Sequence, residues 1–233
     1  MTSNLVEDYL QAALAGRRDV ALAMALGALQ DCGDVCRVHE ELLRRALVEV
    51  GRRWRAGEMS VAAEHVATAV TQYVVVQLYP HMSRPGARRG RLLMAGLQGE
   101  QHQLGAMMVA DALEADGWEL RFLGSNVLAD ELLRFAAEFQ PQVLALSCTM
   151  KKPLARTAAL LADLRRTLGP RAPLCMVGGQ AFEGLSPEQA CRRVGADAWA
   201  GDLDGALAAA RALAARLPAP DGRSSAALLE TSP

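Results

Sequence analysis

The chain has 233 residues, of which 51% are hydrophobic and 22% charged, and its formal net charge is -1. This near-neutral balance excludes the basic surface on which nucleic-acid binding depends, so we expect no direct contact with nucleic acid. No apolar run reaches the roughly 20 residues needed to cross a bilayer, and the N-terminus lacks the basic and apolar segments of a secretory signal. The five cysteines are scattered and odd in number, which favours reduced thiols in a cytoplasmic protein.

Residues 1–84 carry apolar side chains at spacings of three and four, the pattern of amphipathic helices. Four helices joined by short connections are expected here, and together they predict a four-helix bundle. The expected helices cover residues 5–14, 21–29, 38–54 and 61–78. Ser60 is a suitable N-cap for the last of them. Residues 85–90 contain one proline, two glycines and two arginines, and are the expected linker to the rest of the chain.

From residue 91 on, short apolar runs alternate with helical segments. The expected strands cover residues 92–97, 119–123, 143–147, 174–177 and 198–200. The expected helices cover residues 105–116, 128–139, 153–168, 186–194 and 203–217. This alternation predicts an α/β domain over residues 91–217, with a doubly wound, Rossmann-like (flavodoxin-like) parallel sheet of five strands. Residues 218–233 have the composition of a flexible tail.

A histidine lies on the loop that leaves the first expected strand, in the run Glu100-Gln101-His102-Gln103-Leu104-Gly105. Ligands of open parallel sheets bind at the carboxyl ends of the strands. His102 can therefore reach a ligand above the sheet, and Glu100 can fix its tautomer and raise its basicity. We predict that His102 is a metal ligand supported by Glu100. The usual glycine-rich signatures of phosphate-cradling nucleotide sites do not occur, which disfavours nucleotide binding of that kind.

This run resembles the signature of cobalamin-binding domains, more often written Asp-x-His-x-x-Gly, then Ser-x-Leu on a later strand and a Gly-Gly pair. Here Ser147-Cys148-Thr149 ends the third expected strand, and Gly178-Gly179 follows the fourth. Thr149 stands where leucine is usual, and glutamate replaces aspartate, as in the light-sensing branch of the family.

The resemblance implies that cobalamin binds base-off, with its dimethylbenzimidazole tail buried in the sheet region and His102 as the lower axial ligand of cobalt. It also implies a set of residues in contact with the lower part of the cofactor: Glu100, Gln101, Gly105, Ser147, Thr149, Gly178 and Gly179. A glycine at such a place removes a Cβ that would collide with a closely approaching ligand.

The upstream helices contain a second motif, Trp54 followed after nine residues by Glu64-His65. It is similar to the Trp-x9-Glu-His motif of B12-dependent photoreceptors of the CarH type. In that family a helical bundle caps the upper corrin face, and these residues surround the 5′-deoxyadenosyl group, which implies adenosylcobalamin. The best-known members have a histidine directly after the tryptophan. Here it is Arg55, which cannot ligate cobalt, so the upper position after photolysis falls to His65 or to water.

The resemblance spans roughly residues 5–215, and we expect no DNA-binding domain in this sequence. It implies a regulatory light sensor rather than an enzyme, acting through a partner protein or through self-association. Two alternatives stay open. One is a corrinoid methyl-carrier subunit of a methyltransferase system, whose upper face must stay open to a methyl donor. The other is a cobalamin carrier in which light plays no part.

Several further residues have ordinary structural explanations. Cys32 and Cys36 lie four residues apart, but no clustered histidine or second pair completes a metal site, so small, partly buried side chains are expected. His39 is expected at the surface or at a helix end. Met108 and Leu113 belong to an apolar stripe that we expect to pack in the core.

Overall fold

The computed structural model describes residues 1–83, 89–150 and 154–216. Of the expected linker, residues 85–88 lie outside this description, whereas Gly90 already belongs to the first strand. The expected tail at 218–233 also lies outside it. Within the described ranges, none of the helices is both long and apolar enough to span a bilayer.

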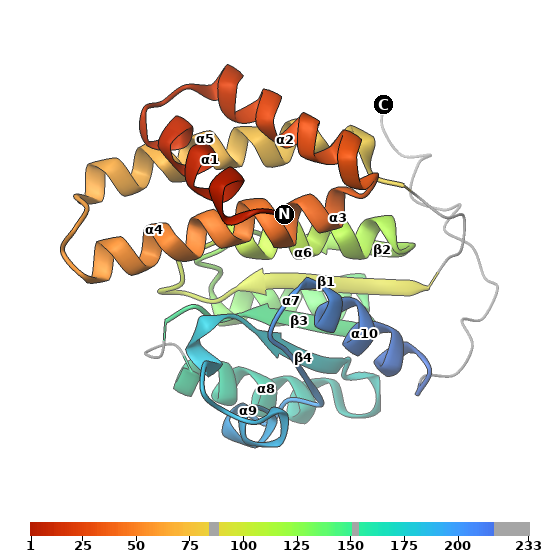
Figure 1. Ribbon diagram of the computed structural model, residues 1–233. Helices are drawn as coiled ribbons and strands as arrows, with labels where there is room; N and C mark the ends of the chain where they lie inside the picture. The colour runs from red at the N-terminus through yellow and green to blue at the C-terminus, as the bar shows by residue number, and fades with distance from the viewer. Residues whose placement is uncertain (84–88, 151–153, 217–233) are drawn as a thin grey trace, which may run out of the picture.

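The first 83 residues form the predicted helical bundle, drawn in red to orange in Figure 1. Its helices are α1 (Ser3–Leu14), α2 (Arg18–Cys32), α3 (Val35–Val38), α4 (Arg45–Arg55) and α5 (Val61–Leu78), with a 3₁₀ turn η2 (Tyr79–His81). Ser60 caps α5 as expected, because its hydroxyl accepts the Ala63 N–H at 3.2 Å. The third expected helix begins earlier, at Val35, and is interrupted by the π-helical turn η1 (His39–Arg44) before it continues as α4.

His39 lies in η1 and is completely buried, so the expected surface or helix-end position was wrong. Neither ring nitrogen has a hydrogen-bond partner within the described part of the chain. Burial lowers the pKa of His39 to about 4, against a smaller opposing effect of the Asp34 carboxylate. A buried imidazole without partners is held neutral, because the charged form would lose its hydration.

Replacing His39 by leucine is expected to remove an acid-sensitive loss of stability. The folded pKa lies below the ordinary 6.5, so stability is full above pH 6.5 and is lost as the pH falls toward about 4. A shift of this size corresponds to about 3 kcal/mol at most. Urea unfolding between about pH 7 and pH 4 should show a shallower decline for His39→Leu than for the parent chain or for a variant of the exposed His81. Equal declines in all three would contradict this assignment.

The second half is the predicted five-stranded parallel sheet, in the order β2-β1-β3-β4-β5. The strands are β1 (Gly90–Gly96), β2 (Trp118–Phe122), β3 (Val143–Ser147), β4 (Leu174–Gly178) and β5 (Ala198–Ala200). The helices between and after them are α6 (Leu104–Ala115), α7 (Ala129–Phe139), α8 (Leu154–Leu168), α9 (Pro187–Val194) and α10 (Leu203–Ala214), with short 3₁₀ turns at η3 (Gly169–Arg171) and η4 (Gln180–Phe182). This order confirms a flavodoxin-like, doubly wound domain.

Helix α6 lies between the bundle and the sheet, as Figure 1 shows. One of its faces packs on the bundle through Leu104, Met108, Ala112 and Ala115, and the other packs on the sheet through Ala106, Ala110 and Leu113. The two sets follow helical spacing, which confirms the expected core stripe. Helix α10 covers the same face of the sheet, and α7, α8 and α9 cover the opposite face.

Polar contacts also join the bundle to the sheet domain. Glu40 in η1 accepts the Leu203 N–H at the start of α10 (3.3 Å), and Arg44 donates to the Gly201 carbonyl (3.4 Å). At the other end of the interface the Tyr79 hydroxyl donates to Glu114 on α6 at 2.8 Å. Together these contacts fix how the bundle sits on the sheet.

Candidate cofactor-binding site

The carboxyl ends of the central strands form one aligned row. Register pairs Gly96 of β1 with Ser147 of β3, Ser147 with Gly178 of β4, and Gly178 with Ala200 of β5. The chain leaves β1 toward β2 on one side and returns to β3 on the other, so the crevice between the loops after β1 and β3 is the topological switch point of the sheet. The predicted residues 100–105 and 147–149 lie at this crevice.

Glu100 and His102 form a pair on the loop after β1. The Nδ1 atom of His102 lies 2.7 Å from Oε1 of Glu100, and the same oxygen accepts the His102 N–H at 2.9 Å. The second carboxylate oxygen crosses to the loop after β3, where it accepts the N–H of Thr149 at 2.6 Å and that of Met150 at 3.3 Å. Glu100 is only 1% exposed, whereas the imidazole of His102 is 58% exposed. A buried carboxylate therefore holds an accessible imidazole.

The electrostatics of this pair match its geometry. Burial opposes ionisation of Glu100, but hydrogen bonds from His102 and from the Thr149 amide outweigh it and lower the pKa of the carboxyl group. The hydrogen bond to Glu100 raises the pKa of His102, against a smaller effect of burial. A carboxylate at Nδ1 favours the tautomer protonated on that nitrogen, which leaves the Nε2 lone pair for a metal.

The donor set fits a metal that is already held by an organic cofactor. No group of three or more His, Cys, Asp or Glu side chains that could hold an ion is found among the described residues. A protein-bound transition metal normally needs three or four such ligands. A single supported imidazole instead suits a metal whose other positions are filled by a macrocycle. A Cβ on Gly105 would meet nothing within 4 Å, so the packing of the protein itself does not require this glycine.

The packing of the protein itself excludes a side chain at the two glycines that end and follow β4. A Cβ on Gly178 would lie 2.9 Å from the Ala200 carbonyl oxygen. A Cβ on Gly179 would lie 2.4 Å from the Cys148 carbonyl oxygen, and the residue has a φ of 102°. The resemblance implies that these glycines leave room for a ligand. The backbone of the neighbouring strands already requires them, so their presence alone is no sign of a cofactor tail.

The second motif lies at one end of the bundle. Trp54 is 46% exposed at the end of α4, and Glu64 and His65 lie in the first turns of α5. Glu64 contacts Nδ1 of His65 and accepts the hydroxyl of Thr68 at 2.8 Å. This end of the bundle and the carboxyl ends of the strands lie on the same side of the molecule, the left in Figure 1.

Glu64 of the bundle lies near enough to His102 to affect its charge. The hydrogen bond to Glu100 raises the pKa of His102 most, and the carboxylate of Glu64 on α5 adds to this effect. The first turns of α5 therefore lie near the loop after β1, although they are distant from it in sequence. Trp54 and His65 lie at the same end of the bundle as Glu64.

Other expected site residues make fewer contacts. Gln101 is exposed, and Ser147 is half-buried without a side-chain hydrogen bond within the described ranges. Arg55 is exposed, and its guanidinium lies 3.5 Å from the position that a Cβ on Gly51 would take.

The backbone amides of Thr149 and Met150 were not predicted as partners of Glu100. No signal in the sequence marks them, because every residue except proline carries the same N–H group.

The doubly wound fold, with an accessible imidazole at its switch point, is that of a ligand-binding α/β domain. Comparison with known protein families identifies the family to which the chain belongs. Residues 90–211 match a B12 binding domain, and residues 5–79 match a second model that is also described as a B12 binding domain. The chain belongs to the family of B12-binding domain proteins, and this membership supports cobalamin as its ligand.

The relatives fall into two groups. The HTH-type transcriptional repressor CarH of Myxococcus xanthus is 30% identical over 71% of this chain, which spans about half (54%) of CarH. A corrinoid protein of Desulfitobacterium hafniense is 20% identical over 89% of this chain and 96% of its own length. The structure of the Methanosarcina barkeri monomethylamine corrinoid protein has a TM-score of 0.79 at 19% identity, over 91% of this chain and all of that protein. This last likeness supports the fold alone.

Proposed function

We propose that this protein is a cobalamin-binding light sensor in which residues 91–217 bind the cofactor and residues 1–84 cap it. Adenosylcobalamin, when bound, supplies a Co–C bond that visible light breaks. The observation that supports the proposal is that Trp54, Glu64 and His65 lie at the end of the bundle on the same side of the molecule as the exposed imidazole of His102, with the Glu64 carboxylate near enough to affect its pKa.

In this proposal, two groups of residues contact opposite faces of the cofactor. His102, oriented by Glu100, ligates the cobalt from below and keeps cobalamin base-off. Trp54 shields the upper ligand with a large indole, while Glu64 and His65 provide hydrogen-bond partners for ribose or adenine. Gln101, Ser147, Thr149, Gly178 and Gly179 line the lower part of the site, where the nucleotide tail enters the sheet region.

The output is a change in protein contacts. Trp54 and Glu64 would contact the upper ligand of a bound cofactor, and a change of that ligand would alter these contacts and shift the bundle relative to the sheet domain. The contacts of Glu40 and Arg44 with the start of α10 are the polar links that such a movement disturbs. The changed surface is read by a regulatory partner protein or by a second copy of this chain.

The test is to load the chain with adenosylcobalamin and to record its absorption spectrum and gel-filtration volume in the dark and after green light. The proposal predicts a base-off, histidine-ligated dark spectrum and a shift in elution volume after illumination. The free cofactor, which also absorbs green light, serves as the control for the spectral change. The chain loaded with hydroxocobalamin should elute at the same volume in the dark and after green light. An unaltered elution volume after complete photolysis would exclude an output through self-association, and a dark spectrum without histidine ligation would count against the proposal as a whole.

A methyl-carrier function is the second candidate, because corrinoid proteins match this chain over nearly their whole length. The dimethylamine corrinoid protein of Methanosarcina barkeri is 23% identical over 91% of this chain and 98% of its own length. A carrier must leave the upper face open to a methyl donor. Binding of methylcobalamin in clear preference to adenosylcobalamin would favour this function over the light sensor.

A further inference from the structure

The end of the bundle that carries Trp54 is not held in place by buried apolar side chains. Between Val50 on α4 and Ala67 on α5 the chain contains no buried residue, and Met59 is the partly buried side chain that packs on the core there. In Figure 1 this turn between α4 and α5 projects beyond the sheet on the left. A helix end without apolar anchoring opens easily, because local stability follows the number of buried contacts.

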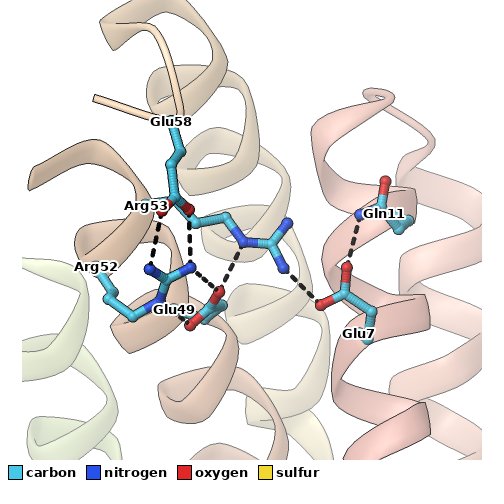
Figure 2. A network of polar contacts seen from close by, with 6 residues as sticks. All are labelled: Glu7, Gln11, Glu49, Arg52, Arg53 and Glu58. Carbon is cyan, nitrogen blue, oxygen red and sulfur yellow. Dashed lines mark hydrogen bonds and ion pairs between the residues drawn. The ribbon is translucent and has the colours of Figure 1, made fainter. Parts of the chain in front are cut away.

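A network of ion pairs joins the segments at this end of the bundle, where buried apolar side chains are lacking. Figure 2 shows this network. Arg53 donates to Glu49 through Nε and to Glu7 on α1 through Nη2, both at 2.7 Å. Arg52 binds Glu49 through Nε and Nη2 at 2.9 Å, and its Nη2 also reaches Glu58 at 2.9 Å. The network therefore joins α4 to α1 on one side and to the α4–α5 turn on the other.

These contacts differ from ordinary surface pairs in what they connect. The pair of Arg166 with Asp163 joins residues three apart on one helix and leaves the tertiary structure untouched. The pairs of Arg53 with Glu7 and of Arg52 with Glu58 instead bridge separate segments. Hydrogen bonds from Arg52 and Arg53 lower the pKa of Glu49 to about 2, so the central carboxylate is ionised at neutral pH.

Position along the helix links the network to Trp54. Arg52 and Arg53 directly precede the tryptophan, and the azimuth of each helical residue is fixed relative to its neighbours. Holding the last turn of α4 in place therefore holds the backbone from which the indole of Trp54 extends. Because the arginines are partly exposed, their attraction to the carboxylates weakens as salt shortens the range of electrostatic forces from about 10 Å at 0.1 M to about 3 Å at 1 M.

We propose that Arg52 and Arg53 are positioning residues for the upper face of the site: their ion-pair network fixes the end of α4 and the indole of Trp54, and salt loosens both. The inference rests on the proposed function only in taking Trp54 as the residue that covers the cofactor. The salt-sensitive anchoring itself is a property of the chain without cofactor.

The first experiment uses the cofactor-free chain. Hydrogen exchange of the amides in residues 51–66 is measured by mass spectrometry for the parent, Arg53→Gln, Arg53→Lys and Arg166→Gln. Arg53→Gln should speed exchange in this segment about three- to fivefold, the change expected for losing a surface ion pair. About 1 M salt should do the same to the parent and should have a smaller effect on the variant, in which only the pairs of Arg52 remain. Arg53→Lys should recover part of the protection, and Arg166→Gln should match the parent.

Unchanged exchange of residues 51–66 in Arg53→Gln would overturn the inference, as would faster exchange spread over the whole bundle. The second readout is the dark absorption spectrum of the chain loaded with adenosylcobalamin, in which Arg53→Gln should lose the adenosyl group several-fold faster than Arg166→Gln. Equal dark loss, with faster exchange in the free chain, would overturn the positioning of Trp54. Failure of the parent to bind adenosylcobalamin would count against the proposed function, while the exchange result would still decide the salt-sensitive anchoring.

Discussion

A His102→Ala variant is expected to lose the histidine-ligated spectrum of bound cobalamin completely. We propose its imidazole, which is exposed at the switch point of the sheet and lies 2.7 Å from Glu100, as the ligand of cobalt. Removal of the ring leaves the lower position to water or to the cofactor's own base, so binding should weaken by about tenfold or more, the range seen when metal-supporting groups are lost. Absorption titration with adenosylcobalamin in the dark measures both effects.

His81→Ala is the matched control for this prediction, because it deletes another exposed imidazole. His81 lies at the opposite end of α5 from Glu64 and His65. The control should bind cobalamin with the parent spectrum. A base-off, histidine-ligated spectrum retained in His102→Ala would show that a different residue holds the cobalt. In that case the pair of Glu100 and His102 would have to be reinterpreted as a structural loop contact.

A Gly179→Ala variant is expected to be among the most destabilised single variants of this chain. The added Cβ would lie 2.4 Å from the Cys148 carbonyl oxygen, and the backbone has a φ of 102° and a ψ of 169°, a region that is essentially restricted to glycine. Strain and overpacking against rigid backbone together should cost about 4 kcal/mol, of which the conformation alone contributes about 1–3 kcal/mol. Urea unfolding monitored by circular dichroism gives the difference in unfolding free energy.

Gly184→Ala separates the two causes of this loss. Gly184 also has a positive φ, 82°, but a Cβ there would meet nothing within 4 Å. Its substitution should therefore cost only the conformational part, about 1–2 kcal/mol. A similar loss in both variants would show that the loop after β4 moves away from Cys148 and that the clash does not matter.

The regular elements of this protein could be predicted from local patterns. The bounds predicted for β3 and β5 are those observed, and Ser60 caps α5 as expected. Burial on one face of a helix or on both faces of a parallel strand leaves a periodic apolar signal, which is visible without knowing the partner element. The π-helical turn at His39 gave no such signal, because the apolar residues of η1 and α4 continue through it at similar spacing.

The pair of Glu100 and His102 could also be found from the sequence, since two residues on one short loop are close whatever surrounds them. The partners of Glu100 on the loop after β3 could not, because they are backbone amides brought near by the adjacency of β1 and β3. The reason within the protein for the Gly178-Gly179 pair could not be predicted either, since only the packed strands reveal the carbonyl oxygens that exclude a Cβ.

The sequence by itself thus determined the order and type of the elements, the bundle before the sheet, and the histidine with its local carboxylate. Only the tertiary structure decided that Glu64 on α5 lies near that histidine and that ion pairs join α4 to α1 and to the α4–α5 turn. Periodicity records whether a residue is buried and on which face. It does not record which distant segment meets it, because that depends on how α6 and α10 pack between bundle and sheet.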